Sequence, residues 1–245
     1  MPQKLNLRLR RPFISIPFEL IKRYADLIKK EHLHLEIYVN SDCLDSLTNK
    51  DIEEIRWIKH PINIHGPYMD LAPGGVDKKI RAVTLERFLT TADLAEVLRP
   101  NIVVFHSGFD KNRYNGFADI WIEGSIEMWK EVLRRLEPLG IKVAIENVFE
   151  DEPENLRILV ERMNSPFFGL CFDTGHFNVF SKISLKDWME SVGSYIFSLH
   201  IHDNRGLRDE HLPPGEGDFD FLELFRLLSN KEIPCTLEMH NEEDV

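Results

Sequence analysis

The chain has 245 residues, of which 43% are hydrophobic, and this is enough apolar material for a large core in one or two domains. Its 30 lysines and arginines against 41 aspartates and glutamates give a formal charge of −11, which disfavours a broadly basic nucleic-acid-binding surface. The apolar runs are much shorter than a membrane span, and the basic N-terminus lacks the apolar segment of a secretory signal. We therefore expect a cytoplasmic protein with no membrane contact.

The cysteines exclude two further classes of protein. Cys43, Cys171 and Cys235 are odd in number and form no CxxC pair. A disulfide framework is therefore not expected, and neither is a zinc site with sulfur ligands.

Short apolar runs rich in β-branched residues alternate with longer amphipathic segments along the whole chain. The segment that begins at Pro17, for example, places Phe18, Ile21, Ala25 and Ile28 at helical spacing. Eight apolar runs are predicted to be strands: residues 5–9, 33–39, 62–65, 101–106, 142–146, 168–173, 196–202 and 235–240.

Eight strands with seven intervening helices predict a (β/α)₈ barrel that forms one domain over residues 1–245. Alternation alone leaves a doubly wound sheet as the alternative, and the polar ends of the strands favour the barrel. Because the chain stops soon after the last strand, most of the eighth helix is expected to be missing. An uncovered apolar strip, and with it a homo-oligomer or a longer natural chain, would follow. The candidates for this strip are Phe18, Ile21, Ala25, Phe221 and Leu224.

Six of the predicted strands end in side chains that bind metals. These are His65, His106, Glu146, Asp173 with His176 shortly after it, His200 and Glu238. The carboxyl ends of strands converge on one face of a barrel, so these residues are expected to meet there. The loop after the seventh strand adds Asp209 and His211. Nitrogen and oxygen ligands without thiolate suit zinc or manganese, and a glutamate such as Glu146 or Glu238 can bridge two ions.

The remaining histidines have more ordinary interpretations. A single histidine near a strand end is usually solvated, and His32, His34 and His60 are assigned to that role. His202 and His240 stay open. Period-two alternation turns His202 to the same side as His200, where it would contact substrate or support a ligand. The complete ligand set is too large for coincidence and predicts a metal site.

The stretch "FDTGHFN…SLHIHDNRGLRDEHLPPGEGDFDF…LEMH" resembles the xylose-isomerase-like TIM-barrel superfamily, or AP endonuclease family 2. This superfamily includes sugar-phosphate isomerases and epimerases together with endonuclease IV, and the resemblance runs from about Leu33 to His240. It implies that the nine residues named above fill the ligand positions of the trinuclear zinc site of endonuclease IV. In the mononuclear epimerases of the superfamily only four of these positions would hold the metal: Glu146, Asp173, His200 and Glu238. There the two glutamates also act as acid and base.

The chain departs from endonuclease IV after Glu146, where it reads "ENVFEDEPEN" instead of a stretch that contains glycine and glutamine. An acidic loop at this place would repel a DNA backbone. Tyr68 in "HGPY" matches a tyrosine near the site of the endonuclease, but one residue does not restore DNA binding.

Three functions are compatible with these residues. The first is a divalent-metal-dependent isomerase or epimerase of a small sugar, sugar phosphate or cyclic polyol ketone, with an enediolate intermediate. Glu146 and Glu238 would exchange the proton from opposite faces, and His176 would assist by holding a hydroxyl or phosphate. Substrate contacts are assigned to Tyr68, His202 and Arg205.

The second function is a metal-dependent phosphodiesterase that cleaves DNA at abasic sites, and the third is a non-catalytic metabolite-binding barrel. The acidic loop places the isomerase or epimerase first. The expected cofactor is zinc or manganese, with two or three ions, and the expected partner is a small polyhydroxylated substrate rather than DNA.

Overall fold

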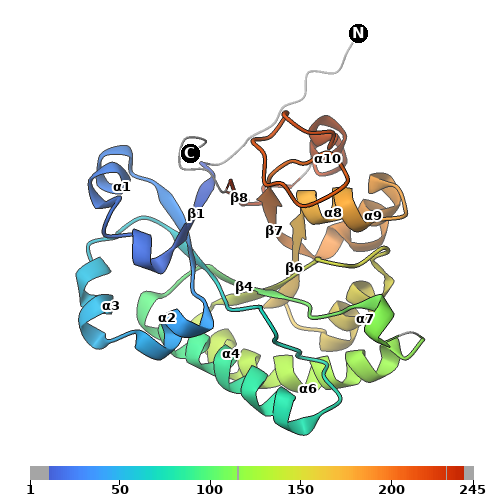
Figure 1. Ribbon diagram of the computed structural model, residues 1–245, viewed down its shortest axis with the longest axis horizontal. Helices are drawn as coiled ribbons and strands as arrows, with labels where there is room; N and C mark the ends of the chain where they lie inside the picture. Colours follow the sequence, from blue (N-terminus) through green and yellow to red (C-terminus); the bar gives the residue numbers. More distant parts are fainter. Residues whose placement is uncertain (1–10, 115, 230, 240–245) are drawn as a thin grey trace.

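The computed structural model describes residues 11–114, 116–229 and 231–239, and these residues form a closed barrel of eight parallel strands in sequential order (Figure 1). The pairing of β1 with β8 closes the sheet, so the barrel is confirmed over the doubly wound alternative. The strands are β1 (Phe13–Pro17), β2 (His34–Tyr38), β3 (Ile62–His65), β4 (Ile102–His106), β5 (Lys142–Glu146), β6 (Phe168–Asp173), β7 (Ile196–Ile201) and β8 (Cys235–Leu237).

Helices connect successive strands and cover the outside of the barrel. The two longest, α4 and α6, pack against each other along one flank (Figure 1). Trp121 and Trp129 of α6 are fully buried in the main core. The α-helices are α1 (Ala25–Glu31), α2 (Ser41–Ser46), α3 (Asn49–Ile55), α4 (Lys78–Leu98), α5 (Lys111–Tyr114), α6 (Ala118–Leu136), α7 (Glu154–Met163), α8 (Thr174–Phe180), α9 (Leu185–Val192) and α10 (Phe221–Leu227).

The first strand differs from the sequence prediction. Residues 5–9 lie outside the described residues, and the barrel begins instead with Phe13–Pro17. The helix that was expected from Pro17 is a 3₁₀ turn over Phe18–Leu20 followed by α1 from Ala25. In the sequence, residues 5–9 and residues 13–17 both place apolar side chains at alternate positions. This pattern therefore did not show which of the two segments forms the first strand.

Inward-facing side chains change from apolar to ionisable along the strands. Val104 and Ala144 lie in a small buried cluster inside the barrel. Two residues further along the same strands, the same face presents His106 and Glu146, which are level with each other in the sheet. Because side chains two residues apart on a strand share a face, the predicted ligands point inward at the carboxyl end of the barrel.

The prediction of an uncovered apolar strip is wrong for three of its residues. Phe18 is 6% exposed, and Ile21 and Leu224 are 0% exposed, because all three pack into the main core. No helix follows β8 within the described residues, which end at Met239. Among the described helices, none combines the length and apolar character that crossing a membrane requires.

The long loop between β7 and α10 is held by the buried carboxylate of Asp203. This carboxylate accepts hydrogen bonds from the backbone N–H groups of four residues at distances between 2.8 and 3.1 Å: Asn204, Gly215, Gly217 and Phe219. The backbone of Asp203 also pairs with Leu212. The same loop carries Asp209 and His211, so the anchor fixes two of the predicted ligands.

Replacing Asp203 with alanine should destabilise the protein by about 2 kcal/mol or more, because several N–H groups would lose a charged acceptor. The free energy of unfolding in urea and the rate of proteolysis within the loop would measure this effect. Glu216→Ala, an exposed change in the same loop, is the matched control. Equal unfolding free energies for the two variants would contradict the proposed role of the anchor.

Candidate metal centre

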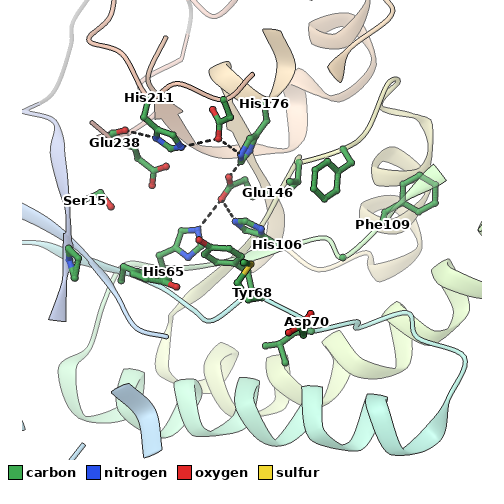
Figure 2. A pocket seen from close by; sticks show the side chains of 18 of the residues that line it. Ser15, His65, Tyr68, Asp70, His106, Phe109, Glu146, His176, His211 and Glu238 are labelled. Atoms are coloured by element: carbon green, nitrogen blue, oxygen red, sulfur yellow. Dashed lines mark hydrogen bonds and ion pairs between the residues drawn. The ribbon is translucent and has the colours of Figure 1, made fainter. Parts of the chain in front are cut away.

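Glu146 lies at the middle of a cluster of imidazoles at the carboxyl end of the barrel (Figure 2). Its Oε2 lies 3.1 Å from Nε2 of His65 and 3.6 Å from Nε2 of His106. The same oxygen is 3.1 Å from Nδ1 of His200, and its Oε1 is 3.1 Å from Nδ1 of His176. Because its two oxygens contact imidazoles from β3, β4, β7 and α8, the carboxylate has the position required of a bridging ligand.

A second group of ligand atoms surrounds Nδ1 of His200. This nitrogen lies 3.3 Å from Oε1 of Glu238 and 3.9 Å from Oδ2 of Asp173, in addition to its approach to Glu146. His200 is fully buried and Nδ1 has no hydrogen-bond partner. Of the four residues that the resemblance assigns to a mononuclear site, the three carboxylates therefore surround one nitrogen of the fourth, His200.

A third group is centred on Asp209 in the β7–α10 loop. Its Oδ2 lies 2.9 Å from Nε2 of His211 and 3.4 Å from Nε2 of His176. The ring of His211 stacks on that of His202 at 3.9 Å between centroids. The nine predicted ligands thus form three adjoining groups in one bowl, although their role as ligands stays a prediction.

The charges of this cluster fit a bound cation. In the part of the chain that the structure describes, no lysine or arginine pairs with Glu146, Asp173 or Glu238, all of which are largely buried. Buried carboxylates need a compensating positive charge. With the unsatisfied Nδ1 of His200, the imidazoles and carboxylates have the composition of a zinc or manganese site, and the buried thiol of Cys171 also lies close to Glu146 and His200.

Burial and mutual attraction shift the acidities of the cluster. Burial opposes the ionisation of Glu146, but the surrounding imidazoles, with His200 foremost, lower its pKa well below the usual range. Desolvation opposes protonation of His176, but neighbouring carboxylates, with Asp173 foremost, raise its pKa well above the usual value. The pKa of His200 is also raised well above the usual value, because Cys171 and then the carboxylates around the ring outweigh its desolvation. Burial lowers the pKa of His106 to about 3, so this ring is neutral.

The predicted substrate contacts lie in different surroundings. Tyr68 lines the cavity, and its ring stacks on His106 at 4.2 Å (Figure 2). His202 is fully buried, and its Nε2 lies 2.9 Å from Oδ2 of Asp173, which is the geometry of a residue that supports a ligand. Arg205 is exposed, pairs with Glu210 at 2.9 Å and is not among the residues that line the cavity.

The histidines that were assigned to ordinary roles lie apart from this cluster. His34 begins β2 and His60 precedes β3, so both belong to the amino ends of the strands. Nδ1 of His32 lies 3.2 Å from Nε2 of His60. His240 lies outside the described residues.

Sequence analysis missed two buried carboxylates that belong to this region. Asp203 anchors the loop that carries Asp209 and His211, and Glu36 of β2 approaches Nε2 of His200 at 2.7 Å. The signal for Glu36 was present in "LHLEIYV", where a carboxylate interrupts an otherwise apolar strand. A charge at such a position is rarely buried unless it has a partner.

The acidic stretch after β5 carries less free charge than the sequence indicates. Asp151 pairs with Lys111 at 2.8 Å and with Lys182 at 3.2 Å. Glu150 is buried against Ser107 and the N–H of Val148, and burial raises its pKa to about 7. Repulsion of a DNA backbone by this loop is therefore weaker than the sequence suggested.

A cavity of about 1250 Å³ opens above the cluster and continues toward β1 and α1. Apolar side chains at its mouth include Met69, Val76, Phe149 and Phe180. Its carboxylates outside the histidine cluster are Asp70, Asp77 and Asp110, and Arg113 is the sole arginine or lysine among the described residues that line it.

With this fold and this cluster established, the comparisons identify the class of protein. Residues 47–245 match the family described as xylose isomerase-like TIM barrel, and the chain belongs to this family. Among curated relatives it is 30% identical over 179 residues to the uncharacterised protein MJ1311 of Methanocaldococcus jannaschii. That match covers 70% of this chain and 60% of the relative. The chain spans only 49% of the next relative, protein y4fM of Sinorhizobium fredii.

Solved structures and one further relative carry more specific names. The TTHB071 protein of Thermus thermophilus, soaked with zinc chloride, is 25% identical with a TM-score of 0.81 over 95% of this chain and 93% of that one. A D-tagatose 3-epimerase-like protein is also 25% identical, with a TM-score of 0.79 over 95% and 92%. An inosose isomerase of Bacillus licheniformis is 34% identical over 109 residues, which is 39% of this chain and 38% of that protein.

Protein prepared without chelator should contain about two to three divalent ions per chain, because the three ligand groups exceed the needs of one ion. Replacing His106 or His211 with alanine should each remove about one ion, as measured by elemental analysis. His32→Ala, which changes a histidine outside the cluster, is the control. A metal content of about one ion or fewer in the unmodified protein, with both variants unchanged, would contradict this prediction.

Metal binding should release protons and strengthen as the pH rises from about 6 to about 8. The sign follows from His176 and His200, whose raised pKa values keep the metal-free rings protonated near neutral pH. An incoming ion must displace these protons. Calorimetric titrations in two buffers of different ionisation enthalpy would measure the release, and an affinity that is independent of pH would disprove the coupling.

Proposed function

We propose that this protein is a divalent-metal-dependent isomerase or epimerase of a small polyhydroxylated ketone. The observation that carries the proposal is the convergence of Glu146, Asp173 and Glu238 on one buried nitrogen, Nδ1 of His200. The similarity to an inosose isomerase and to a D-tagatose 3-epimerase-like protein supports an isomerase or epimerase, and the zinc-soaked relative supports a metal.

The two glutamates would carry the proton. Glu146 projects from β5 and Glu238 follows β8, and each approaches Nδ1 of His200, from 3.1 and 3.3 Å. A substrate carbon held between them would lose its proton to one carboxylate and regain a proton from the other. A divalent ion held by these residues would polarise the adjacent carbonyl and stabilise the developing negative charge. His176, which is near the cavity, would hold a hydroxyl of the substrate.

The mouth of the cavity favours an uncharged substrate over a phosphorylated one. Asp70, Asp77 and Asp110 would repel a phosphate, whereas Arg113 alone among the described lining residues could attract it. Met69 and Phe149 add apolar surface, against which the C–H faces of a sugar or cyclic polyol can pack. We therefore favour a neutral ketose or a cyclic polyol ketone.

A phosphodiesterase of the endonuclease IV type is the second candidate. His106, Asp209 and His211 complete a nine-residue cluster although a mononuclear epimerase does not need them. This surplus favours a site with several ions, which suits phosphoryl transfer. The carboxylates at the mouth argue against it, because a DNA backbone would have to pass them.

Two assays on the same metal-loaded protein would separate these candidates. We expect solvent deuterium to enter the carbon next to the carbonyl in one or more members of a panel of neutral ketoses and inosose-type ketones, with weaker exchange into their phosphates. Glu146→Gln and Glu238→Gln should each reduce exchange by at least about 100-fold. Unfolding curves of the variants would verify that the fold is retained, and Glu152→Gln, an exposed change, is the control.

The competing outcomes have clear meanings. Efficient cleavage of a duplex with an abasic site, without exchange into any ketone, would replace the proposal with the phosphodiesterase. Absence of both activities in a protein that retains its ions would favour a binding protein.

A further inference from the structure

A buried carboxylate lies beneath the central ligand group and is not one of its ligands. Glu36 is in the middle of β2, is 0% exposed, and is level with Asn63 of β3 in the sheet. Its inward position follows from the alternation of β2, where Leu35 and Ile37 on either side pack into the outer core. A carboxylate at this place is costly unless its neighbours compensate it.

Its two oxygens contact side chains of three other strands, β3, β7 and β8. Oε2 accepts a hydrogen bond from Oγ1 of Thr236 at 2.8 Å and a longer one from Nδ2 of Asn63 at 3.4 Å. Oε1 lies 2.7 Å from Nε2 of His200. The N–H bond at Nε2 does not point at Oε1, so the two groups form a close ion pair rather than a well-formed hydrogen bond. The carboxylate is therefore fixed on one side and faces the histidine on the other.

The two nitrogens of His200 consequently have different surroundings. Nε2 faces Glu36, whereas Nδ1 faces Glu146 and Glu238. A carboxylate this close to one nitrogen of an imidazole favours the proton on that nitrogen, which leaves the lone pair of the other nitrogen free to bind a metal and makes the ring a stronger ligand. Glu36 does not line the cavity, and within the described residues His200 is the one predicted ligand with which it forms an ion pair. Its influence on a bound metal would therefore pass through His200.

We propose that Glu36 is a positioning residue that holds His200 with Nε2 protonated and Nδ1 directed at the metal. The inference rests on the metal site of the proposed function, and it adds an interaction that the ligand pattern in the sequence does not contain. Thr236 and Asn63 would keep the carboxylate from turning away, which extends the site into β3 and β8.

The experiment compares the unmodified chain with Glu36→Gln and Glu36→Ala. Zinc affinity would be measured by competition with a chromophoric chelator, and the geometry of the site by the visible absorption bands of the cobalt(II)-substituted protein. We expect zinc affinity to fall about 10-fold in Glu36→Gln and up to about 100-fold in Glu36→Ala, with shifted cobalt bands in both. Nitrogen-15 spectra of histidine-labelled, zinc-loaded wild type should show His200 bound through Nδ1 and protonated at Nε2.

Glu150→Gln is the matched control, because Glu150 is also a buried carboxyl but bonds to Ser107 and Val148 and, within the described residues, forms no ion pair with a predicted ligand. Its zinc affinity should stay within about twofold of wild type. Equal losses in the Glu36 and Glu150 variants would overturn the inference, and so would unchanged affinity and cobalt bands in Glu36→Gln. If Glu36→Ala does not fold, Glu36→Gln decides alone. Failure of the wild type to bind zinc or cobalt would instead refute the metal site itself, and the inference with it.

Discussion

The attraction between one buried carboxylate and four imidazoles holds the functional end of this barrel together. Glu146 of β5 reaches His65 of β3, His106 of β4, His176 after β6 and His200 of β7. A carboxylate buried to this degree would be strongly disfavoured by itself, and imidazoles packed so closely would repel one another if protonated. The carboxylate and the imidazoles therefore stabilise each other, and a divalent cation would complete the compensation of the buried negative charge.

The surrounding structure serves to keep these groups in place. Asp203 accepts hydrogen bonds from the backbone of the β7–α10 loop and so positions Asp209 and His211 in the cluster. Gly175 leaves room for His202, since a Cβ at this position would collide with the imidazole. His202 in turn contacts Asp173. Beneath them Glu36 contacts His200. The predicted ligands are thus supported by residues whose side chains do not line the cavity, an arrangement that is usual in metal sites.

The cavity combines a highly polar floor with a partly apolar mouth. The floor carries the imidazoles and carboxylates, whereas Met69, Val76, Phe149 and Phe180 border the opening. Electrostatic effects are strongest where water is excluded, so Glu146 and Glu238 would act most strongly on a molecule held at the floor. Pairing of Asp151 with Lys111 and Lys182 also means that the acidic loop is less decisive for the choice of substrate than its sequence suggests. The carboxylates of Asp70, Asp77 and Asp110 bear more directly on that choice.

The amino-acid sequence by itself determined the barrel and the residues that meet in its bowl. Strand alternation and the rule that carboxyl ends converge were sufficient to gather His65, Glu146 and His200 from distant parts of the chain. Tertiary structure alone decided that the barrel begins at Phe13, because two alternating segments competed for that position. It also decided that Phe18, Ile21 and Leu224 are covered, and that Glu36 and Asp203 are tied to the site. Local patterns specify which face a side chain occupies, but the partner that compensates a buried charge comes from another strand or loop, and only folding brings the two together.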